Sequence, residues 1–228
     1  MDYPELRSEL IATCRRMNAL GLNQGRAGNA SVRVPGGMLI TPTGMAYDAL
    51  GPADIVALAD DGSLAPGQRR PSSEWPLHLA ILRARPEVGA VIHTHAMFCT
   101  TLACLGLEIP AFHYMVAVAG GDSIRCAPYA TFGSAELAAR ALAALQERTA
   151  CLLANHGMVA VAPDLAQALE LAQEVETLAA MYWRALAVGR PRLLSAVEMA
   201  RVVEKFKTYG QQPESAAATA DSQPQETM

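Results

Sequence analysis

Two histidines separated by a single residue, His93 and His95, end a short apolar stretch in the middle of the chain. The residues before them, 88–92, are small or β-branched and follow Pro86, which predicts a fully buried strand. Because residues i and i+2 of a strand project from the same face, the two imidazoles should lie side by side at its end. Zinc and similar divalent ions bind imidazole nitrogen readily, so the pair indicates a metal site. The alternative is a hydrogen-bonded histidine in an apolar core.

A catalytic zinc site uses three protein ligands and leaves one position open, so a third ligand should come from elsewhere in the chain. His156 interrupts a second apolar, strand-like stretch, residues 151–161, as the first pair does. Gly157 follows it and would allow a close approach of the backbone. His78 falls in a helical pattern and His113 precedes an aromatic residue, so both are weaker candidates. We therefore expect two histidine-bearing strands to share one site.

Composition limits the classes of protein that the chain can belong to. With 228 residues, 51% hydrophobic and 18% charged, it suits one large, extensively buried α/β domain. A net charge of −4 removes the electrostatic argument for nucleic acid binding. No apolar run approaches the roughly 18 residues that span a bilayer, and the acidic N-terminus lacks the regions of a signal peptide. We expect a cytoplasmic protein that binds neither nucleic acid nor membrane.

The cysteines do not form a metal-binding or disulfide pattern. Their number is odd, their spacing is wide, and no pair forms the CxxC spacing. We expect them to be reduced and buried among apolar neighbours rather than to bind the metal. They are Cys14, Cys99, Cys104, Cys126 and Cys151.

Two glycine-bearing loops should lie at the ends of the neighbouring strands of a predicted hairpin. Strand patterns over residues 31–34 and 38–40 flank a proline-glycine turn. Loops of this kind offer backbone N–H groups and hydroxyls to an anion such as phosphate, although most short glycine turns are only turns. The loop residues in question are Gly28, Asn29, Thr43 and Gly44.

Ser72, Ser73 and Glu74 precede a helical pattern that runs to about residue 82. The serines are expected N-cap residues, and Pro76 fits the first turn. Glu74 is then an acid favoured by the helix dipole. A sharper interpretation places the two hydroxyls and the helix N-terminus on an anion, with the carboxylate directed at the metal. The two interpretations are compatible.

The remaining patterns predict further elements without an internal repeat or a domain linker. A strand is expected at residues 54–59, and residues 211–228 are small and polar, which predicts a disordered tail. Asp164 and Ser134 are expected helix N-caps. Helices are expected over residues 4–20, 96–105, 135–148, 165–186 and 194–209.

Two glycine loops, a Ser-Ser-Glu, an HxH and a distant His-Gly, in this order and spacing, resemble the class II aldolase/adducin family. The resemblance extends from about residue 10 to residue 210, and the likeness is greatest to the aldolases that cleave L-fuculose 1-phosphate. It implies a single three-layer α/β domain over residues 1–210, with a central, largely antiparallel sheet flanked by helices. The stretches that carry it are residues 21–25, 38–44, 113–115, 126–133 and 204–210.

The resemblance also implies roles for individual residues. His93, His95 and His156 would bind zinc. Glu74 would be the catalytic carboxylate, which can approach the metal when no substrate is bound. Tyr114 would relay a proton across a subunit interface, whereas its local pattern alone indicates an ordinary strand aromatic. The residues that match the family's phosphate cradle and a nearby C-terminal tyrosine are Gly28, Asn29, Thr43, Gly44, Ser72, Ser73 and Tyr209.

The activity that the resemblance implies is that of a zinc-dependent class II aldolase, a carbon–carbon lyase. Such an enzyme reversibly cleaves a ketose 1-phosphate, here of the L-fuculose 1-phosphate type, to dihydroxyacetone phosphate and a small aldehyde. The family also implies a homotetramer with active sites between subunits, and manganese or cobalt as alternative metals. No lysine lies among the motifs, which disfavours a Schiff-base mechanism.

Three alternatives remain open at this point. One is an aldolase for 5-deoxyribulose or 5-methylthioribulose 1-phosphate. Another is a ribulose-phosphate 4-epimerase, whose substrate carries its phosphate at the other end of the sugar. The third is an adducin-like structural module without metal, against which the presence of all three histidines argues.

Overall fold

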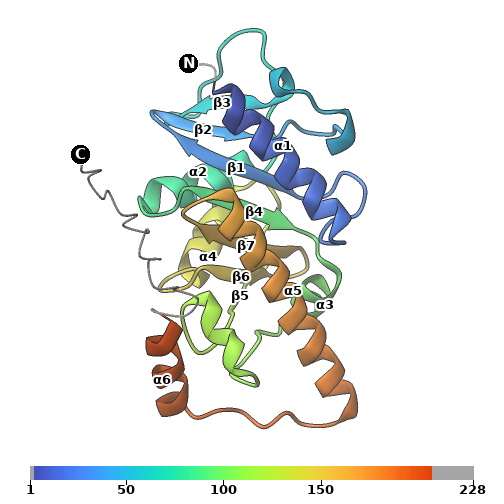
Figure 1. Ribbon diagram of the computed structural model, residues 1–228, viewed down its shortest axis with the longest axis vertical. Coiled ribbons are helices and arrows are strands. Elements are labelled where there is room, and N and C mark those ends of the chain that lie inside the picture. The colour runs from blue at the N-terminus through green and yellow to red at the C-terminus, as the bar shows by residue number, and fades with distance from the viewer. Residues whose placement is uncertain (1–2, 207–228) are drawn as a thin grey trace, which may run out of the picture.

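The structure, a computed structural model, describes residues 3–206 (Figure 1). Tyr209 and the tail predicted at 211–228 lie outside these residues, and the single domain predicted over residues 1–210 stays a prediction. The strands are β1 (Asn29–Val34), β2 (Gly37–Ile40), β3 (Val56–Ala59), β4 (Ala90–Thr94), β5 (Cys126–Ala127), β6 (Ala150–Leu153) and β7 (Gly157–Ala162). The α-helices are α1 (Pro4–Ala19), α2 (Trp75–Ala84), α3 (Met97–Cys104), α4 (Ala135–Ala144), α5 (Leu165–Val188) and α6 (Ala196–Phe206), with 3₁₀ helices at Tyr47–Ala49, Pro52–Asp54 and Tyr114–Ala119.

The strands form one sheet in the order β3-β2-β1-β4-β7-β6-β5. Every neighbouring pair is antiparallel except β5 and β6, which run parallel. The predicted hairpin of β1 and β2 is confirmed, with Ser31 opposite Ile40. β4 lies in the middle of the sheet between β1 and β7, so the strand that carries His93 is supported on both edges.

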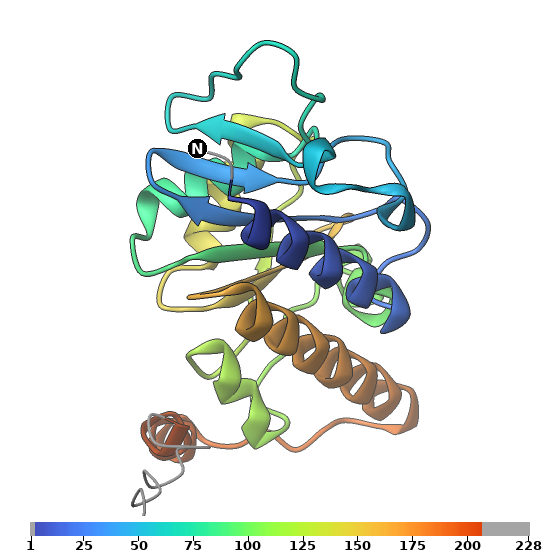
Figure 2. The same ribbon diagram turned by 45° about the horizontal axis from the view of Figure 1, so that its top comes forward.

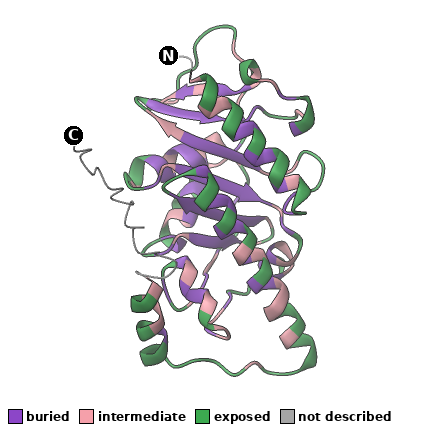
Figure 3. Ribbon diagram, viewed as in Figure 1, coloured by how far each residue is buried: buried purple, intermediate pink, exposed green. Residues whose placement is uncertain are grey.

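Helices cover both faces of this sheet, which confirms the predicted three-layer α/β fold. Ala30, Ile92 and Ala160 project to the face covered by α1, α3 and α5, while Val91 and Val159 project to the face covered by α2 and α4. Figure 2 shows α1 and α5 running along the same side of the sheet. Because both faces are covered, the central strands are continuous apolar runs rather than alternating ones, and Figure 3 shows them almost wholly buried.

The second histidine-bearing stretch differs from its prediction. Residues 151–161 are not one strand with a polar interruption but two antiparallel strands, β6 and β7, joined by a tight turn. Asn155 adopts a φ of 55° in this turn, a left-handed conformation that asparagine tolerates better than most residues. His156 therefore lies in a turn at the end of the sheet, not on a strand.

Smaller differences concern element ends and one tyrosine. The strand predicted from residue 54 begins at Val56, because Pro52–Asp54 forms a 3₁₀ helix. Tyr114 begins another 3₁₀ helix and is 47% exposed, so the local prediction of a strand aromatic is wrong. Cys104 is exposed and Cys126 is half-buried, whereas the other three cysteines are buried as expected; all five are free thiols.

The predicted helix caps at Asp164 and Ser134 are confirmed, since each side chain accepts a backbone N–H of the first turn that follows. Helix α3 is capped from a distance instead. The Glu176 carboxylate on α5 accepts the backbone N–H groups of Phe98 and Cys99, both at 2.9 Å. A carboxylate at a helix N-terminus is favourable, so α5 fixes the start of the helix that follows His95. Within residues 3–206, no helix combines the length and apolarity that a membrane crossing requires.

Candidate metal centre

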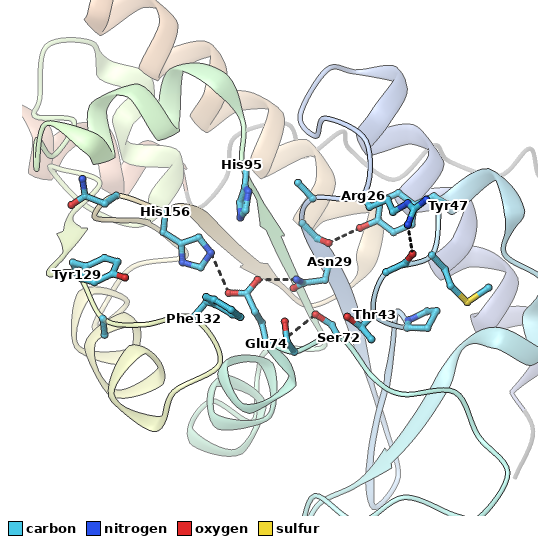
Figure 4. A pocket seen from close by; sticks show the side chains of 18 residues that line it. Arg26, Asn29, Thr43, Tyr47, Ser72, Glu74, His95, Tyr129, Phe132 and His156 are labelled. Carbon is cyan, nitrogen blue, oxygen red and sulfur yellow. Dashed lines mark hydrogen bonds and ion pairs between the residues drawn. The ribbon is translucent and has the colours of Figure 1, made fainter.

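Four side chains from separate parts of the sequence meet at one end of the sheet. Glu74, His93, His95 and His156 each direct one ligand atom to a common point, and these atoms lie within 4.8 Å of one another. The Nε2 atoms of His93 and His95 are 3.1 Å apart. The Glu74 carboxylate oxygens lie 3.1 Å from His93 Nε2 and 3.2 Å from His156 Nε2. Figure 4 shows Glu74 beside His156 and Asn29, with His95 across from it. The meeting of three histidines, expected from the sequence, is present.

Sheet order explains why these residues meet. His93 ends β4, and the turn that carries His156 leads into β7, the neighbour of β4. Gly157 is needed at this contact, because a Cβ there would lie 2.3 Å from the Thr94 carbonyl oxygen. Gly28 is needed on the other side, since its φ is 76° and a Cβ would lie 2.7 Å from the His93 carbonyl oxygen. The expected close backbone approach at Gly157 is confirmed.

The hydrogen bond of His93 to the backbone determines which ring nitrogen is left to face the cluster. Its Nδ1 lies 2.9 Å from the Met158 carbonyl oxygen, and because a carbonyl only accepts, Nδ1 carries the proton. When the ring carries only this proton, as a metal ligand must, its Nε2 lone pair faces the Glu74 carboxylate. Glu74 Oε1 is buried and has no hydrogen-bond partner. Lone pairs and a carboxylate at this separation repel one another unless a cation lies between them, so the residues fit a metal ion.

The electrostatic surroundings favour the forms that bind metal. Burial lowers the pKa of His95, and burial together with the neighbouring His93 lowers the pKa of His156 to about 4. Burial by itself would raise the pKa of Glu74. The positive charge that His93 and His156 carry when protonated, together with hydrogen bonds from His93 and Asn29, outweighs burial and holds this pKa well below its usual range. At neutral pH, His95 and His156 are therefore neutral and Glu74 is ionised.

A buried hydrogen-bonded chain lies behind Glu74. Asn29 Nδ2 donates to Glu74 Oε2 at 3.0 Å, and Asn29 Oδ1 lies 2.5 Å from His78 Nε2. His78 Nδ1 lies 2.7 Å from the Ser31 hydroxyl oxygen. His78 is fully buried, and burial lowers its pKa to about 3. The sequence indicated His78 only as part of a helix, which is correct, but not this contact with the centre.

A cavity of about 330 Å³ opens onto the metal centre. That size suits a small ligand. His95, His156 and Glu74 line it, while His93 lies beneath them and is fully buried. The residues predicted to cradle an anion all line the same cavity: Gly28, Asn29, Thr43, Gly44, Ser72 and Ser73.

Two of the backbone N–H groups in this predicted anion site are already bonded within the protein. The backbone N–H of Thr43 donates to the Arg70 carbonyl, and that of Ser72 to the Thr41 carbonyl, so neither is free for a ligand. The serines are not N-caps of α2 either. The helix begins at Trp75, Glu74 occupies the N-cap position, and the Ser72 hydroxyl accepts the Glu74 N–H in the turn before it. The Glu74 carboxylate points into the cluster instead of capping the helix.

The sequence interpretation missed several residues that line the cavity. Arg26 supplies the one guanidinium among them within the described part of the chain, and it donates to the Gly44 carbonyl at 3.0 Å. Tyr47 donates its hydroxyl to the Gly28 carbonyl at 2.7 Å and so fixes the first glycine loop. Tyr129 and Phe132 add aromatic rings that are 55% and 63% exposed. The position of Arg26 inside a predicted anion loop was an available signal; nothing local indicated the others.

Tyr114 is not among the residues that line this cavity. It lies on the 3₁₀ helix that packs against α5 and α6, with its side chain half exposed. The structure therefore does not bring Tyr114 to the metal centre of its own chain, and its role stays a prediction. The same holds for Tyr209, which lies outside residues 3–206.

Comparison with known families adds to this geometry. Residues 8–183 match the model of the class II aldolase and adducin N-terminal domain. That match covers most of the chain. The chain belongs to the class II aldolase and adducin family. The predicted family is thus confirmed, and with it the class of aldolases, which are carbon–carbon lyases.

Individual relatives are similar over almost their whole length. The chain is 58% identical to a 5-methylthioribulose-1-phosphate/5-deoxyribulose-1-phosphate aldolase of Rhodospirillum rubrum, over 90% of this chain and 92% of that protein. It is 50% identical to an L-fuculose phosphate aldolase of Escherichia coli, over 92% and 98% of the two chains. A solved L-fuculose 1-phosphate aldolase superposes with a TM-score of 0.87 and 41% identity, covering 91% of this chain and 98% of its own.

The low pKa of His78 makes the stability of the protein depend on pH. The unfolded chain takes up this proton near the ordinary value of 6.5, whereas the folded protein resists it down to about 3, so stability falls as the pH falls below 6.5. Between pH 7 and pH 5, this one residue should cost about 2 kcal/mol of unfolding free energy.

His78→Leu removes that titration. We expect the difference in stability between wild type and His78→Leu to shift by about this amount in favour of the variant between pH 7 and pH 5. Urea unfolding of both proteins at each pH, with a chelator present so that metal binding contributes to neither, measures the shift. An unchanged difference would show that His78 is accessible to protons in the folded state.

Proposed function

We propose that this protein is a zinc-dependent class II aldolase that reversibly cleaves a ketose 1-phosphate to dihydroxyacetone phosphate and a small aldehyde. The observation that carries the proposal is the convergence of Glu74, His93, His95 and His156 beside a cavity with an anion-binding rim. A structural module has no need of such a centre, and an epimerase finds less support in relatives named as ketose-1-phosphate aldolases.

The three histidines and, in the resting state, Glu74 would hold the metal, since imidazole and carboxylate are ligands that zinc prefers. Manganese and cobalt are alternative divalent ions that the same ligands would also bind. The chemistry that a bound divalent ion supplies is Lewis-acid polarisation of the substrate carbonyl and stabilisation of the negative charge that develops on its oxygens. The Nδ1–H bond of His93 to Met158 keeps the imidazole turned toward that ion.

Protein side chains would move the protons. In cleavage, Tyr114 takes the proton of the hydroxyl next to the breaking carbon–carbon bond, and that oxygen becomes the carbonyl of the departing aldehyde. The electron pair of the broken bond stays on the three-carbon fragment. In the aldol direction the ionised Glu74 takes a proton from that carbon. In cleavage it returns one, which it must first take up from solvent, and Tyr114 releases to solvent the proton that it removed, so the protons balance over one turnover.

The phosphate would lie at the rim of the cavity. Hydroxyls of Thr43, Ser72 and Ser73 line this part together with the loop residues Gly28, Asn29 and Gly44. Arg26 adds a positive charge there, which favours the binding of a doubly charged phosphate. Binding the phosphate holds a small substrate in register with the metal centre. Tyr209, from outside the described residues, would complete the substrate site.

Two substrates are supported by specific observations. The L-fuculose 1-phosphate type rests on the relatives from Escherichia coli and on the solved structure. The 5-methylthioribulose and 5-deoxyribulose 1-phosphates rest on the 58% identical relative. Tyr129 and Phe132 line the cavity, and aromatic rings suit an aldehyde end that terminates in a methyl or thioether group.

We further propose a cytoplasmic homotetramer with active sites between subunits. All five cysteines lie in the described part of the chain and none forms a disulfide there, which fits a reducing compartment. Tyr114 is exposed and absent from the cavity of its own chain, so it can reach a metal centre only if it comes from a second copy. A site that a single chain leaves incomplete fits an assembly in which a neighbouring subunit supplies the missing residue.

A panel of sugar phosphates tests the activity. The purified protein should release dihydroxyacetone phosphate from L-fuculose, 5-deoxyribulose or 5-methylthioribulose 1-phosphate, and the ranking of kcat/KM identifies the preferred aldehyde end. Ribulose 5-phosphate, with its phosphate at the other end, is the matched control and should not be cleaved. If none of the three 1-phosphates were cleaved, or if ribulose 5-phosphate were epimerised instead, the proposed reaction would be wrong.

Metal analysis tests the centre. We expect about one zinc ion per chain by mass spectrometry, and loss of cleavage when a chelator removes it. His95→Asn should weaken zinc binding by at least about 10–100-fold, as judged by competition with a fluorescent chelator. His113→Asn is the control, because His113 caps a 3₁₀ helix away from the cluster and asparagine can do the same. Full activity in chelated protein would contradict the proposal.

Subunit mixing tests the origin of Tyr114. Tyr114→Phe and Glu74→Gln should each be nearly inactive alone. When the two variants are co-assembled in equal amounts, about a quarter of the sites receive both intact residues from two different chains, so activity should return to that level. No return of activity, from variants that each keep fold and assembly, would show that Tyr114 does not act across an interface.

A further inference from the structure

Ser31, His78, Asn29 and Glu74 form an unbroken hydrogen-bonded chain, and every member is buried. The spacing of its members follows from two elements. Asn29 and Ser31 are i and i+2 on β1 and share a face of the sheet, while Glu74 and His78 are i and i+4 at the start of α2 and share a side of the helix. Strand and helix therefore present two polar residues each to one buried seam in an otherwise apolar layer.

The chemistry of each group fixes the direction of the chain. An ionised carboxylate only accepts, so the Asn29 amide nitrogen donates to Glu74 and the Asn29 amide oxygen faces His78. Because that oxygen cannot donate, Nε2 of His78 carries the proton. Nδ1 of the neutral ring is then an acceptor and takes the hydroxyl hydrogen of Ser31. His78 thus holds the opposite tautomer to His93, whose proton is on Nδ1.

The burial of His78 independently supports its neutral state. The side chain is fully buried, and burial places its pKa at about 3, so the ring carries a single proton at neutral pH. His78 does not line the cavity, and neither does Ser31. A role in the reaction would therefore have to act through Asn29 and Glu74.

We propose that His78, with Ser31 behind it, is a positioning residue that holds the Asn29 carboxamide with its NH₂ group toward Glu74. In this orientation Asn29 fixes the direction of one carboxylate oxygen and leaves the other oxygen, Oε1, for the metal centre. Without a donor at position 78, the buried amide oxygen of Asn29 has no partner, and the carboxamide loses one of the two contacts that fix its position beside Glu74. The inference rests on the proposed role of Glu74 as metal ligand and proton-transfer group.

Two substitutions at His78 separate this role from simple packing. His78→Gln keeps an amide N–H that can donate to Asn29, whereas His78→Leu fills a similar volume without any donor. We expect His78→Leu to lower zinc affinity and kcat by about 10–100-fold each with little change in KM, and His78→Gln to recover most of both. A residue that only fills the core would give the reverse order, because an apolar side chain suits an apolar layer better than a buried amide.

Further variants keep the test decisive. Ser31→Ala removes only a hydroxyl and should reduce zinc affinity and kcat in the same direction, by less. Ile81→Val, a fully buried position on the same helix, is the control that loosens packing without touching the polar chain; it should lower the melting temperature and leave both quantities unchanged. In a Glu74→Gln background, His78→Leu should have no additional effect on the residual rate, since it acts through Glu74.

The outcomes distinguish this inference from the proposed function. Folded His78→Leu and Ser31→Ala proteins with wild-type zinc affinity and kcat, or a His78→Leu variant better than His78→Gln, would overturn the positioning role. If wild type cleaves none of the ketose 1-phosphates, the proposed reaction fails, and the order of zinc affinities among the variants still decides whether His78 positions Asn29 and Glu74.

Discussion

A carboxylate and the lone pairs of imidazole rings repel one another when they are brought within about 3 Å in a buried place, unless a positive charge lies among them. Glu74, His93, His95 and His156 are held in that arrangement. His93 cannot relieve the repulsion by turning, because its other nitrogen is bonded to Met158. The fold thus creates a place that fits a cation, and binding of a cation there would stabilise the fold.

The rest of the structure keeps the four side chains in place. Central strand β4 is paired on both edges, and the turn before β7 carries His156 to the same end of the sheet. Glycines at positions 28 and 157 allow the backbones to approach that end closely. Helix α2 delivers Glu74 from its N-terminus, and the Glu176 carboxylate fixes the helix that follows His95. Each of the four side chains therefore comes from a well-supported part of the fold, which keeps their geometry fixed.

The cavity beside the centre has a polar part and an aromatic part. Hydroxyls, glycine loops and Arg26 line one part of the cavity, and the rings of Tyr129 and Phe132 line another (Figure 4). Tyr114 lies on an exposed 3₁₀ helix outside this cavity, so its proposed part in the reaction would need a second copy of the chain.

Local spacing in the sequence determined most of the secondary structure and part of the candidate site. The HxH spacing at the end of β4 predicted that His93 and His95 lie together, although His95 follows the strand. The glycine loops at Gly28 and Gly44 marked the ends of a hairpin, and Asp164 and Ser134 marked helix starts, because these signals depend on backbone geometry within a few residues. Only the tertiary structure decided that residues 151–161 fold as a hairpin with His156 in its turn. It also decided that His78 bonds to Asn29, because a contact between a strand and a helix far along the chain depends on the order of strands and the packing of layers, which no local pattern contains.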